Sequence, residues 1–207
     1  MTNYENLIVR LSYVFKKNSL ELCRLDSNAG DGDHGLTMER GFTKAEEKII
    51  SSNENYDMSS YFKEIGYSML ASMGGASGPI FSTMFIQWAI EMKDKKEFTS
   101  KNFIAIIKKT IDAIYELIGT KKGDKTMVDA LYGAYEKIQD QENLPLNQIL
   151  KLAHEGACEG ADSTKGLIAK KGRAKFLGER SKGFIDAGAM SVSLILKTVY
   201  EVLGEKK

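Results

Sequence analysis

Apolar residues recur every three or four positions along most of this chain, and this period constrains its fold more than any other feature. Residues at that spacing lie on one side of an α-helix, whereas strands alternate with a period of two. The clearest stripes consist of Leu7, Leu11, Val14 and Phe15; of Phe103, Ile107, Ile111, Ile114 and Ile118; and of Val192, Ile195, Leu196, Val199 and Leu203. Weaker stripes cover roughly 35–50, 58–73, 79–92, 126–140 and 146–163. The pattern predicts an all-α fold of about eight amphipathic helices.

The chain shows no sign of division into separate units. Only two prolines, Pro79 and Pro145, occur among its 207 residues, which leaves long stretches free for helix. No internal repeat, low-complexity tract or linker interrupts it. We therefore expect residues 1–207 to form a single domain, large enough to bury its own core.

Charge and hydropathy exclude several classes of partner. The 29 basic residues nearly balance the 28 acidic ones, so no overall field attracts nucleic acid or an anionic membrane. No apolar run approaches the roughly 18–20 residues that a membrane-spanning helix needs. The first residues lack the basic and then apolar segments of a secretory signal. These features predict a cytoplasmic protein that binds neither nucleic acid nor membrane.

Glycines gather in the segments between the predicted helices, at 30–35, 74–78, 119–123 and 166–188. One glycine commonly ends a helix, but several of these segments carry two or three beside Asp, Ser, Thr or Lys. Such loops let backbone N–H groups approach a phosphate, and the helix that follows adds a favourable dipole. The four segments are therefore the candidate functional regions.

The first of these segments is acidic. Residues 25–35 (LDSNAGDGDHG) are too rich in glycine for regular secondary structure, and their carboxylates have the spacing D-x4-D-x-D at Asp26, Asp31 and Asp33. Mg²⁺ prefers such oxygen ligands, often together with phosphate oxygens. An EF-hand is excluded, because counting from Asp31 places Leu36 at its glycine position and Phe42 at its glutamate position. A cation site and an Asp-rich capping turn both remain open.

The next two segments are weaker signals by themselves. MGGASGP (73–79) suits close approach by a phosphate, but a tight turn between helices has the same composition. In KKGDKTMVDA (121–130), Thr126 is either a helix N-cap or a phosphate contact, and the spacing of a P-loop is absent. His34 is likewise either a ligand contact or a helix-start histidine with a local hydrogen bond.

The fourth segment, residues 165–183, is strongly basic. It carries seven basic residues and one acid, Glu179, and it interrupts the helical pattern for about twenty residues. Such a segment either closes over phosphates, docks a partner or is a solvated loop. Together, the carboxylates, the small-residue loops and the basic segment favour a Mg²⁺–polyphosphate site.

The four segments, in this order, resemble the nucleotide-binding L subunits of bacterial dihydroxyacetone kinases. The matching motifs are D-x4-DGDHG at 26–35, GGASGP at 74–79, GDKTM at 123–127 and KGRAKFLGERSKG at 171–183, so the resemblance covers nearly the whole chain. It implies a barrel of eight amphipathic helices that binds the nucleotide in the loops at one end. It also implies that the single domain is a nucleotide-binding domain.

The resemblance also assigns the site residues. Two Mg²⁺ ions would be held by Asp26, Asp31 and Asp33. The expected nucleotide contacts are His34, Gly35, Leu36, Thr37, Ala76, Ser77, Gly119, Met127, Arg173, Asp186, Ala187 and Gly188. Two positions depart from the family pattern, since Ala187 replaces a frequent proline and Thr37 a frequent asparagine. Loss of the proline frees a backbone torsion, so the segment that closes the pocket is expected to be looser here.

The resemblance further implies a kinase subunit that acts only with partners. ADP or ATP would stay bound as a coenzyme, rephosphorylated by a phosphohistidine phosphocarrier subunit fed from phosphoenolpyruvate. The phosphoryl group would pass to dihydroxyacetone, held by a histidine of a separate substrate-binding subunit. This chain would then supply no catalytic residue beyond its metal site, which agrees with its two histidines, His34 and His154, neither placed as a nucleophile.

Several alternatives remain open at this point. A related kinase, such as the nucleotide-binding part of a fatty acid kinase, uses the same helical domain. A non-catalytic nucleotide-binding regulator is a further reading, although the three aspartates argue against it. The length of the chain, without a fused substrate domain, favours the phosphotransferase-dependent branch. The sequence leaves the oligomeric state open, a homodimer included.

Overall fold

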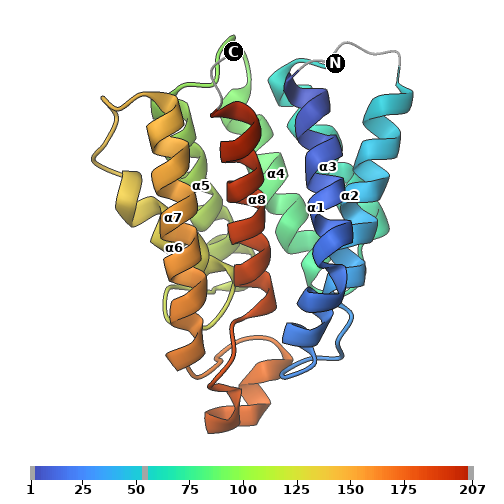
Figure 1. Ribbon diagram of the computed structural model, residues 1–207, viewed down its shortest axis with the longest axis vertical. Helices are drawn as coiled ribbons and strands as arrows, with labels where there is room; N and C mark the ends of the chain where they lie inside the picture. Colours follow the sequence, from blue (N-terminus) through green and yellow to red (C-terminus); the bar gives the residue numbers. More distant parts are fainter. Residues whose placement is uncertain (1–2, 53–55, 205–207) are drawn as a thin grey trace.

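The protein is all-helical throughout the two ranges, 3–52 and 56–204, that our computed structural model describes. Eight α-helices and two 3-10 segments occur there and no strand. Figure 1 shows how they are arranged. In chain order they are α1 (Asn3–Asp26), α2 (His34–Ser51), α3 (Met58–Ser72), α4 (Ser77–Met92), α5 (Ser100–Ile118), α6 (Met127–Ile138), α7 (Leu146–Ser163), η1 (Thr164–Gly166), η2 (Arg173–Ser181) and α8 (Ala187–Leu203). The all-α prediction is confirmed, and none of these helices has the length and low charge that crossing a membrane requires.

The helices form a closed ring. Each α-helix packs against the next in the chain, and α8 packs against α1 to complete the circuit, with an additional contact between α6 and α8. Fully buried aromatic rings fill one side of the interior: Phe15 stacks on Phe42, which meets Phe85 edge to face, and Phe85 lies against Trp88. The apolar stripes of the sequence therefore face one shared core.

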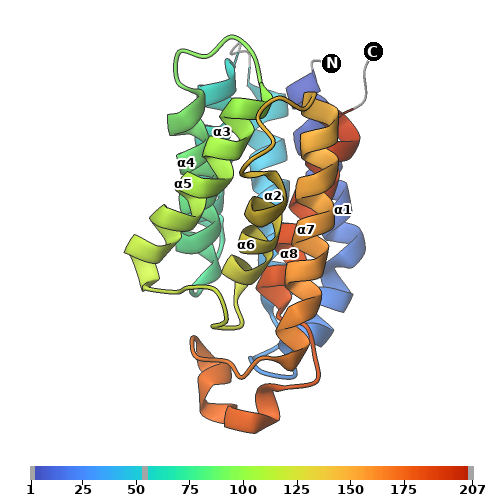
Figure 2. The ribbon, with the colours of Figure 1, turned by 90° about the vertical axis from the view of Figure 1, so that its left-hand side faces the viewer.

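Because the helices run alternately up and down, successive connections between them lie at opposite ends of the ring. The segments 27–33, 73–76, 119–126 and 164–186 all lie at one end of the ring, the lower end in Figures 1 and 2. The four glycine-rich segments of the sequence thus lie at the same end of the ring as the starts of α2, α4, α6 and α8. The described ends of the chain lie at the opposite end of the ring.

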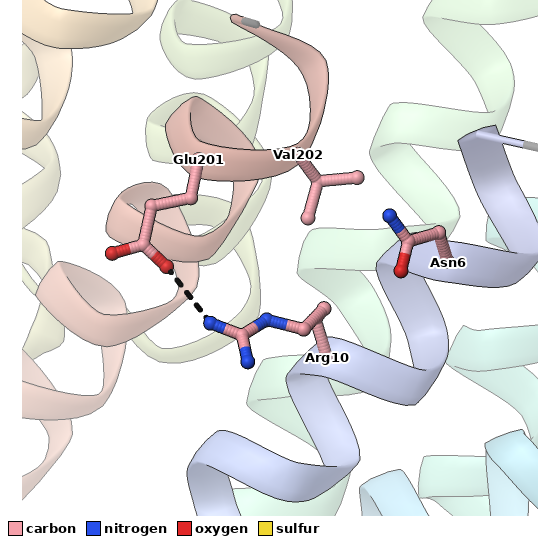
Figure 3. A pocket seen from close by; sticks show the side chains of 4 residues that line it. All are labelled: Asn6, Arg10, Glu201 and Val202. Carbon is pink, nitrogen blue, oxygen red and sulfur yellow. Dashed lines mark hydrogen bonds and ion pairs between the residues drawn. The ribbon is translucent and has the colours of Figure 1, made fainter.

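A pocket of about 460 Å³ also lies at that opposite end. Figure 3 shows its lining residues, Asn6 and Arg10 from α1 and Glu201 and Val202 from α8. An ion pair of 3.4 Å joins the Arg10 guanidinium to the Glu201 carboxylate across it. The pocket is therefore separated from the glycine-rich segments by the length of the ring.

The helix ends explain two differences from the sequence prediction. Residues 25–35 are not entirely outside regular structure, because α1 continues through Asp26 and α2 begins at His34. The basic segment does interrupt the α-helical pattern, but it contains the 3-10 turns η1 and η2. Positive φ angles at Gly172 and Gly178 bound and break η2, which prevents a continuous helix there.

Candidate functional site

Three carboxylates form an acidic cluster at the lower end of the ring. Asp26 is the last residue of α1, and Asp31 and Asp33 lie on the loop that follows. One carboxylate oxygen from each lies within 4.8 Å of the others. Asp31 and Asp33 are exposed and Asp26 is half-buried, so the cluster is open to solvent. This set of oxygen donors fits Mg²⁺, which takes carboxylates and completes its shell with water or phosphate.

Asp26 has a second, structural role. Its Oδ2 accepts hydrogen bonds from the backbone N–H groups of Gly32 (2.9 Å), Asp33 (3.1 Å) and His34 (3.4 Å). Asp33, the N-cap residue of α2, makes no capping bond with its own side chain. Through its Oδ2, the carboxylate at the end of α1 therefore satisfies the start of α2. The capping turn that the sequence allowed is therefore present, and the same loop carries the carboxylates of the candidate cation site.

His34 joins three helices rather than making a local bond. Its Nδ1 lies 3.2 Å from Ser77 Oγ on α4, and its Nε2 lies 2.8 Å from Ser191 Oγ on α8. The Ser191 hydroxyl donates to the carbonyl of Ala187, so Nε2–H donates to Ser191 and Nδ1 accepts from Ser77. Burial lowers the pKa of His34 to about 4, which keeps the ring neutral. The imidazole thus fixes the acidic loop against the starts of α4 and α8.

The small-residue loop leaves room above the start of α4. A Cβ atom at Gly74 or Gly75 would meet no heavy atom within 4 Å. Ala76, the N-cap residue, has no side-chain acceptor for the first N–H groups of the helix. An uncapped helix start beside open space is suited to a phosphate group. Ala76 is exposed, whereas Ser77 is half-buried and its hydroxyl bonds to His34.

The third segment is held by a capping box. The Thr126 side chain accepts from the Val128 N–H, and the Asp129 carboxylate accepts from the N–H groups of Thr126 (2.8 Å) and Gly123 (2.6 Å). The structure thus bears out the N-cap role of Thr126, whose signal in the sequence is T-x-x-D ahead of an apolar run. Gly119 ends α5 with φ of 62° and is exposed.

The basic segment crosses the same end of the ring and is called the lid segment (residues 164–186) from here on. In Figures 1 and 2 its orange-red 3-10 turns lie beyond the ends of the helices. Its Arg173 guanidinium pairs with the Asp31 carboxylate at 2.5 Å. Its Lys171 ammonium donates to the carbonyl of Ile118 at 3.2 Å, and its Lys170 lies 3.6 Å from Asp124. The lid segment therefore contacts both the acidic cluster and the loop after α5.

The ion pair also affects the charge of the cluster. The pKa of the Asp31 carboxyl is lowered, first by its own backbone N–H and then by the Arg173 guanidinium. Both side chains are at least half exposed, so the pair adds little to the free energy of unfolding. Its significance is positional, because a guanidinium 142 residues away in the sequence lies at the acidic cluster.

The end of the lid segment leads directly into α8. Asp186 caps this helix by accepting from the Ala189 N–H at 2.8 Å, and burial raises the pKa of its carboxyl to about 6. Gly188 lies against Met127, since a Cβ atom at Gly188 would be 3.3 Å from Met127 Cε. Met127 and Gly188 are therefore neighbours.

The remaining predicted contacts differ in exposure. Leu36 is 53% exposed at the start of α2, whereas Gly35, Thr37 and Ala187 are buried. Gly35 packs directly on α1, because a Cβ atom there would lie 1.9 Å from the Ser19 carbonyl oxygen. All the predicted site residues lie at the lower end of the ring, but Gly35, Thr37 and Ala187 are buried in the protein, as are His34 and Gly188.

The raised pKa of Asp186 predicts a pH dependence of stability. Between about pH 4 and pH 6, native Asp186 keeps a proton that the unfolded chain releases, so the free energy of unfolding falls as the pH rises. Asp186→Asn preserves an oxygen acceptor for the cap and removes this titration. Relative to the variant, the wild type should lose about 1–3 kcal/mol between pH 4 and pH 7. Urea unfolding of metal-free and nucleotide-free protein measures the difference, and parallel pH profiles would contradict it.

Three residues with structural roles at the site were not predicted from the sequence. Ser191 holds His34, and Lys125 and Thr164 connect the lid segment to its surroundings. Lys125 lies within the predicted GDKTM motif, so a signal for it was present. Ser191 and Thr164 carry no such signal, because their partners lie far away in the sequence.

Comparisons with known proteins agree with this arrangement. A family model described as the DAK2 domain matches residues 28–201. The chain is 35% identical over 198 residues to the ADP-binding subunit DhaL of the PEP-dependent dihydroxyacetone kinase of Escherichia coli (strain K12), covering 95% of this chain and 94% of that one. It is 32% identical over 191 residues to the ADP-binding subunit DhaL of the PTS-dependent dihydroxyacetone kinase of Lactococcus lactis, covering 91% and 90%.

A solved structure shares the fold. The dihydroxyacetone kinase of C. freundii, crystallised in complex with AMP-PNP and Mg²⁺, superposes with a TM-score of 0.74 at 22% identity. The match covers 95% of this chain but 33% of that kinase, so this chain spans about a third of its length. The likeness confirms the all-helical fold predicted from the sequence.

Proposed function

This chain belongs to the DAK2 domain family, and on that premise we propose that it is the ADP-binding subunit of a phosphoenolpyruvate-dependent dihydroxyacetone kinase. The relatives that it matches over nearly their full length carry this function in their names. We propose further that residues 1–207 act as one nucleotide-binding domain. The protein would then be a phosphotransferase component that works only with partner subunits.

The observation that carries this proposal is the acidic cluster together with what surrounds it. Asp26, Asp31 and Asp33 converge beside an uncapped helix start at Ala76, and Arg173 approaches from the lid segment. Cations that bridge phosphate oxygens and a nearby guanidinium are the groups that phosphoryl transfer requires. A solvated turn would need none of these neighbours.

The three aspartates would hold the metal, and we propose two Mg²⁺ ions with an ADP or ATP coenzyme. When bound, Mg²⁺ neutralises charge on the phosphate oxygens. The chain itself supplies orientation. Asp26 fixes the loop that carries Asp31 and Asp33, and His34 locks that loop to α4 and α8.

The elements around the acidic cluster indicate where each part of the nucleotide would bind. The start of α4 and the small-residue loop would receive the phosphates, and Gly119 and Met127 would lie toward the base and ribose. Asp186, Ala187 and Gly188 would form the segment that closes the pocket. Arg173 would cover the phosphates from the lid segment. With Asp31 exposed at 50% of its side chain, the phosphate end of the site stays accessible to partner proteins.

The partners follow from the chemistry. The phosphoryl group would arrive from a phosphohistidine of a phosphocarrier subunit and would leave to a hydroxyl of dihydroxyacetone on a substrate-binding subunit. Neither histidine of this chain serves that purpose, since His34 is buried between two serines and His154 stacks on Tyr200 far from the cluster. No catalytic residue beyond the metal site is therefore proposed here.

The direct test is the nucleotide content of the purified protein. We expect acid to release about one ADP per chain, and the bound nucleotide to exchange slowly with labelled ATP in the presence of Mg²⁺. The isolated chain should not phosphorylate dihydroxyacetone until both partner subunits and phosphoenolpyruvate are supplied.

The outcomes separate the alternatives. Fast exchange would indicate an ATP-consuming kinase subunit instead of a coenzyme carrier. Bound nucleotide without transfer in the complete system would indicate a regulator. If the purified protein released no nucleotide and bound none from solution, the proposed function would be refuted.

A further inference from the structure

Lys125 is a buried lysine with an unusual set of partners. Its ammonium donates to the carbonyl oxygens of Thr164 and Phe184, both at 2.5 Å, and lies 4.6 Å from the centre of the Phe184 ring. The residue is 3% exposed. An ammonium that gives up water needs such compensation, because burial of an unpaired charge is costly. The partners of its ammonium therefore indicate which parts of the chain Lys125 connects.

The two carbonyls lie at the two ends of the lid segment. Thr164 begins it and Phe184 lies close to its end, twenty residues later. Two further bonds close the same neck: the Gly183 N–H donates to the Lys165 carbonyl at 2.8 Å, and the Asp186 N–H donates to Thr164 Oγ at 2.9 Å. Lys125 thus enters from the loop before α6 and clamps the neck of the lid segment.

The backbone of Lys125 supports a specific role for this clamp. Its φ is 59°, in the left-handed region that residues other than glycine seldom adopt. Burial also lowers the pKa of its ammonium, and Asp186 and Asp129 counteract this shift. Strain and a desolvated charge persist only where the surroundings compensate for them. Here the compensation comes from contacts with the lid segment and the capping box of α6.

We infer that Lys125 is a positioning residue that fixes the neck of the lid segment, and through it the placement of Arg173 on the acidic cluster. Its hydrogen bonds go to Thr164 and Phe184 and not to the acidic cluster or Arg173, so it acts through the lid segment and not on the reacting groups. The inference deepens the proposed function, and its test by nucleotide dissociation rests on that function. Its test by tryptic cleavage of the lid segment does not depend on nucleotide binding.

The first measurement needs no nucleotide. Lys125→Met keeps most of the apolar stem and removes the ammonium that donates both hydrogen bonds. We expect trypsin to cleave the folded variant after Arg173, Lys175 and Arg180 at least about tenfold faster than the wild type, because opening of the neck exposes these bonds. Lys122→Met is the matched control, since Lys122 lies on the same loop but pairs with Glu136 at the exposed surface. Mass spectrometry of the fragments locates the cuts.

The second measurement distinguishes positioning from general support of the fold. In the wild-type background, Lys125→Met should speed dissociation of a fluorescent ADP analogue with Mg²⁺ by about tenfold. In an Arg173→Ala background it should change that rate less than about twofold, because the guanidinium that it positions is gone. Equal effects in the two backgrounds would overturn the role, as would lid cleavage equal to that of Lys122→Met.

A second variant covers the possibility that Lys125→Met does not fold. Thr164→Val removes the acceptor for the Asp186 N–H at the same neck without burying or removing a charge. It should accelerate the same three tryptic cuts and the same dissociation, and unchanged cleavage would overturn the inference. If no variant or wild-type protein binds nucleotide, the proposed function fails, while the cleavage rates still decide the role of Lys125.

Discussion

Asp31→Asn is expected to abolish phosphoryl transfer in the reconstituted kinase and to release the bound Mg²⁺–nucleotide. The substitution keeps the size of the side chain but removes one of the three negative charges that converge within 4.8 Å. Loss of the metal's charge stabilisation should lower the transfer rate by about a thousandfold, which corresponds to about 4 kcal/mol. Calorimetric titration with Mg²⁺ and ADP measures the accompanying loss of affinity.

Asp31 is the most informative of the three aspartates. Asp26 also binds three backbone N–H groups of the loop, so its replacement would disturb the fold as well as the metal site. Asp31 is exposed and its replacement should change the free energy of unfolding by less than about 0.5 kcal/mol. Asp112→Asn is the control, because this carboxylate pairs with Lys108 on the surface of α5. If both variants kept full transfer and metal affinity, the acidic cluster would be only a capping turn.

Gly35→Ala is expected to destabilise the whole protein and to weaken the metal site at the same time. The new Cβ would lie 1.9 Å from the Ser19 carbonyl oxygen and 2.9 Å from the Cys23 nitrogen. These are backbone atoms of α1, so the helices must move apart, at a cost of about 3 kcal/mol or more. For a chain of this size, that lowers the melting temperature by about 6–12 °C.

The effect on the metal site follows from the position of Gly35. It lies in the first turn of α2, next to His34 and two residues after Asp33, so a shift of this helix moves one ligand and the imidazole lock. Gly166→Ala is the matched control, because its Cβ meets nothing within 4 Å and its φ is not left-handed. A Gly35→Ala protein as stable as Gly166→Ala, with unchanged Mg²⁺ affinity, would show that the close contact with α1 is unimportant.

The helices could be predicted from local patterns with little error. The stripes at 58–73, 79–92 and 146–163 correspond closely to α3, α4 and α7. The largest difference is at α1, which continues to Asp26 beyond its apolar stripe. The acidic loop is shorter than its glycine content suggested, because α1 continues past the buried Leu22 and Leu25 to Asp26, and α2 already begins at His34.

The candidate site was predictable as a set of segments, and its internal connections were not. Four glycine-rich segments alternate with the helices, and in an up-and-down ring they necessarily fall at one end. The acidic spacing of Asp26, Asp31 and Asp33 then indicates a cation. The partner of each side chain, in contrast, depends on which helices are neighbours and how deeply they pack.

The sequence by itself therefore determined the eight helices and the residue types gathered in the glycine-rich segments between them, because helical periodicity and loop composition are local properties. Tertiary structure alone decided that His34 bonds to Ser77 and Ser191, 43 and 157 residues away. It also decided that Lys125 clamps the two ends of the lid segment. Those bonds exist only after α2, α4, α6 and α8 have packed, since packing removes the water that would otherwise satisfy the same polar groups.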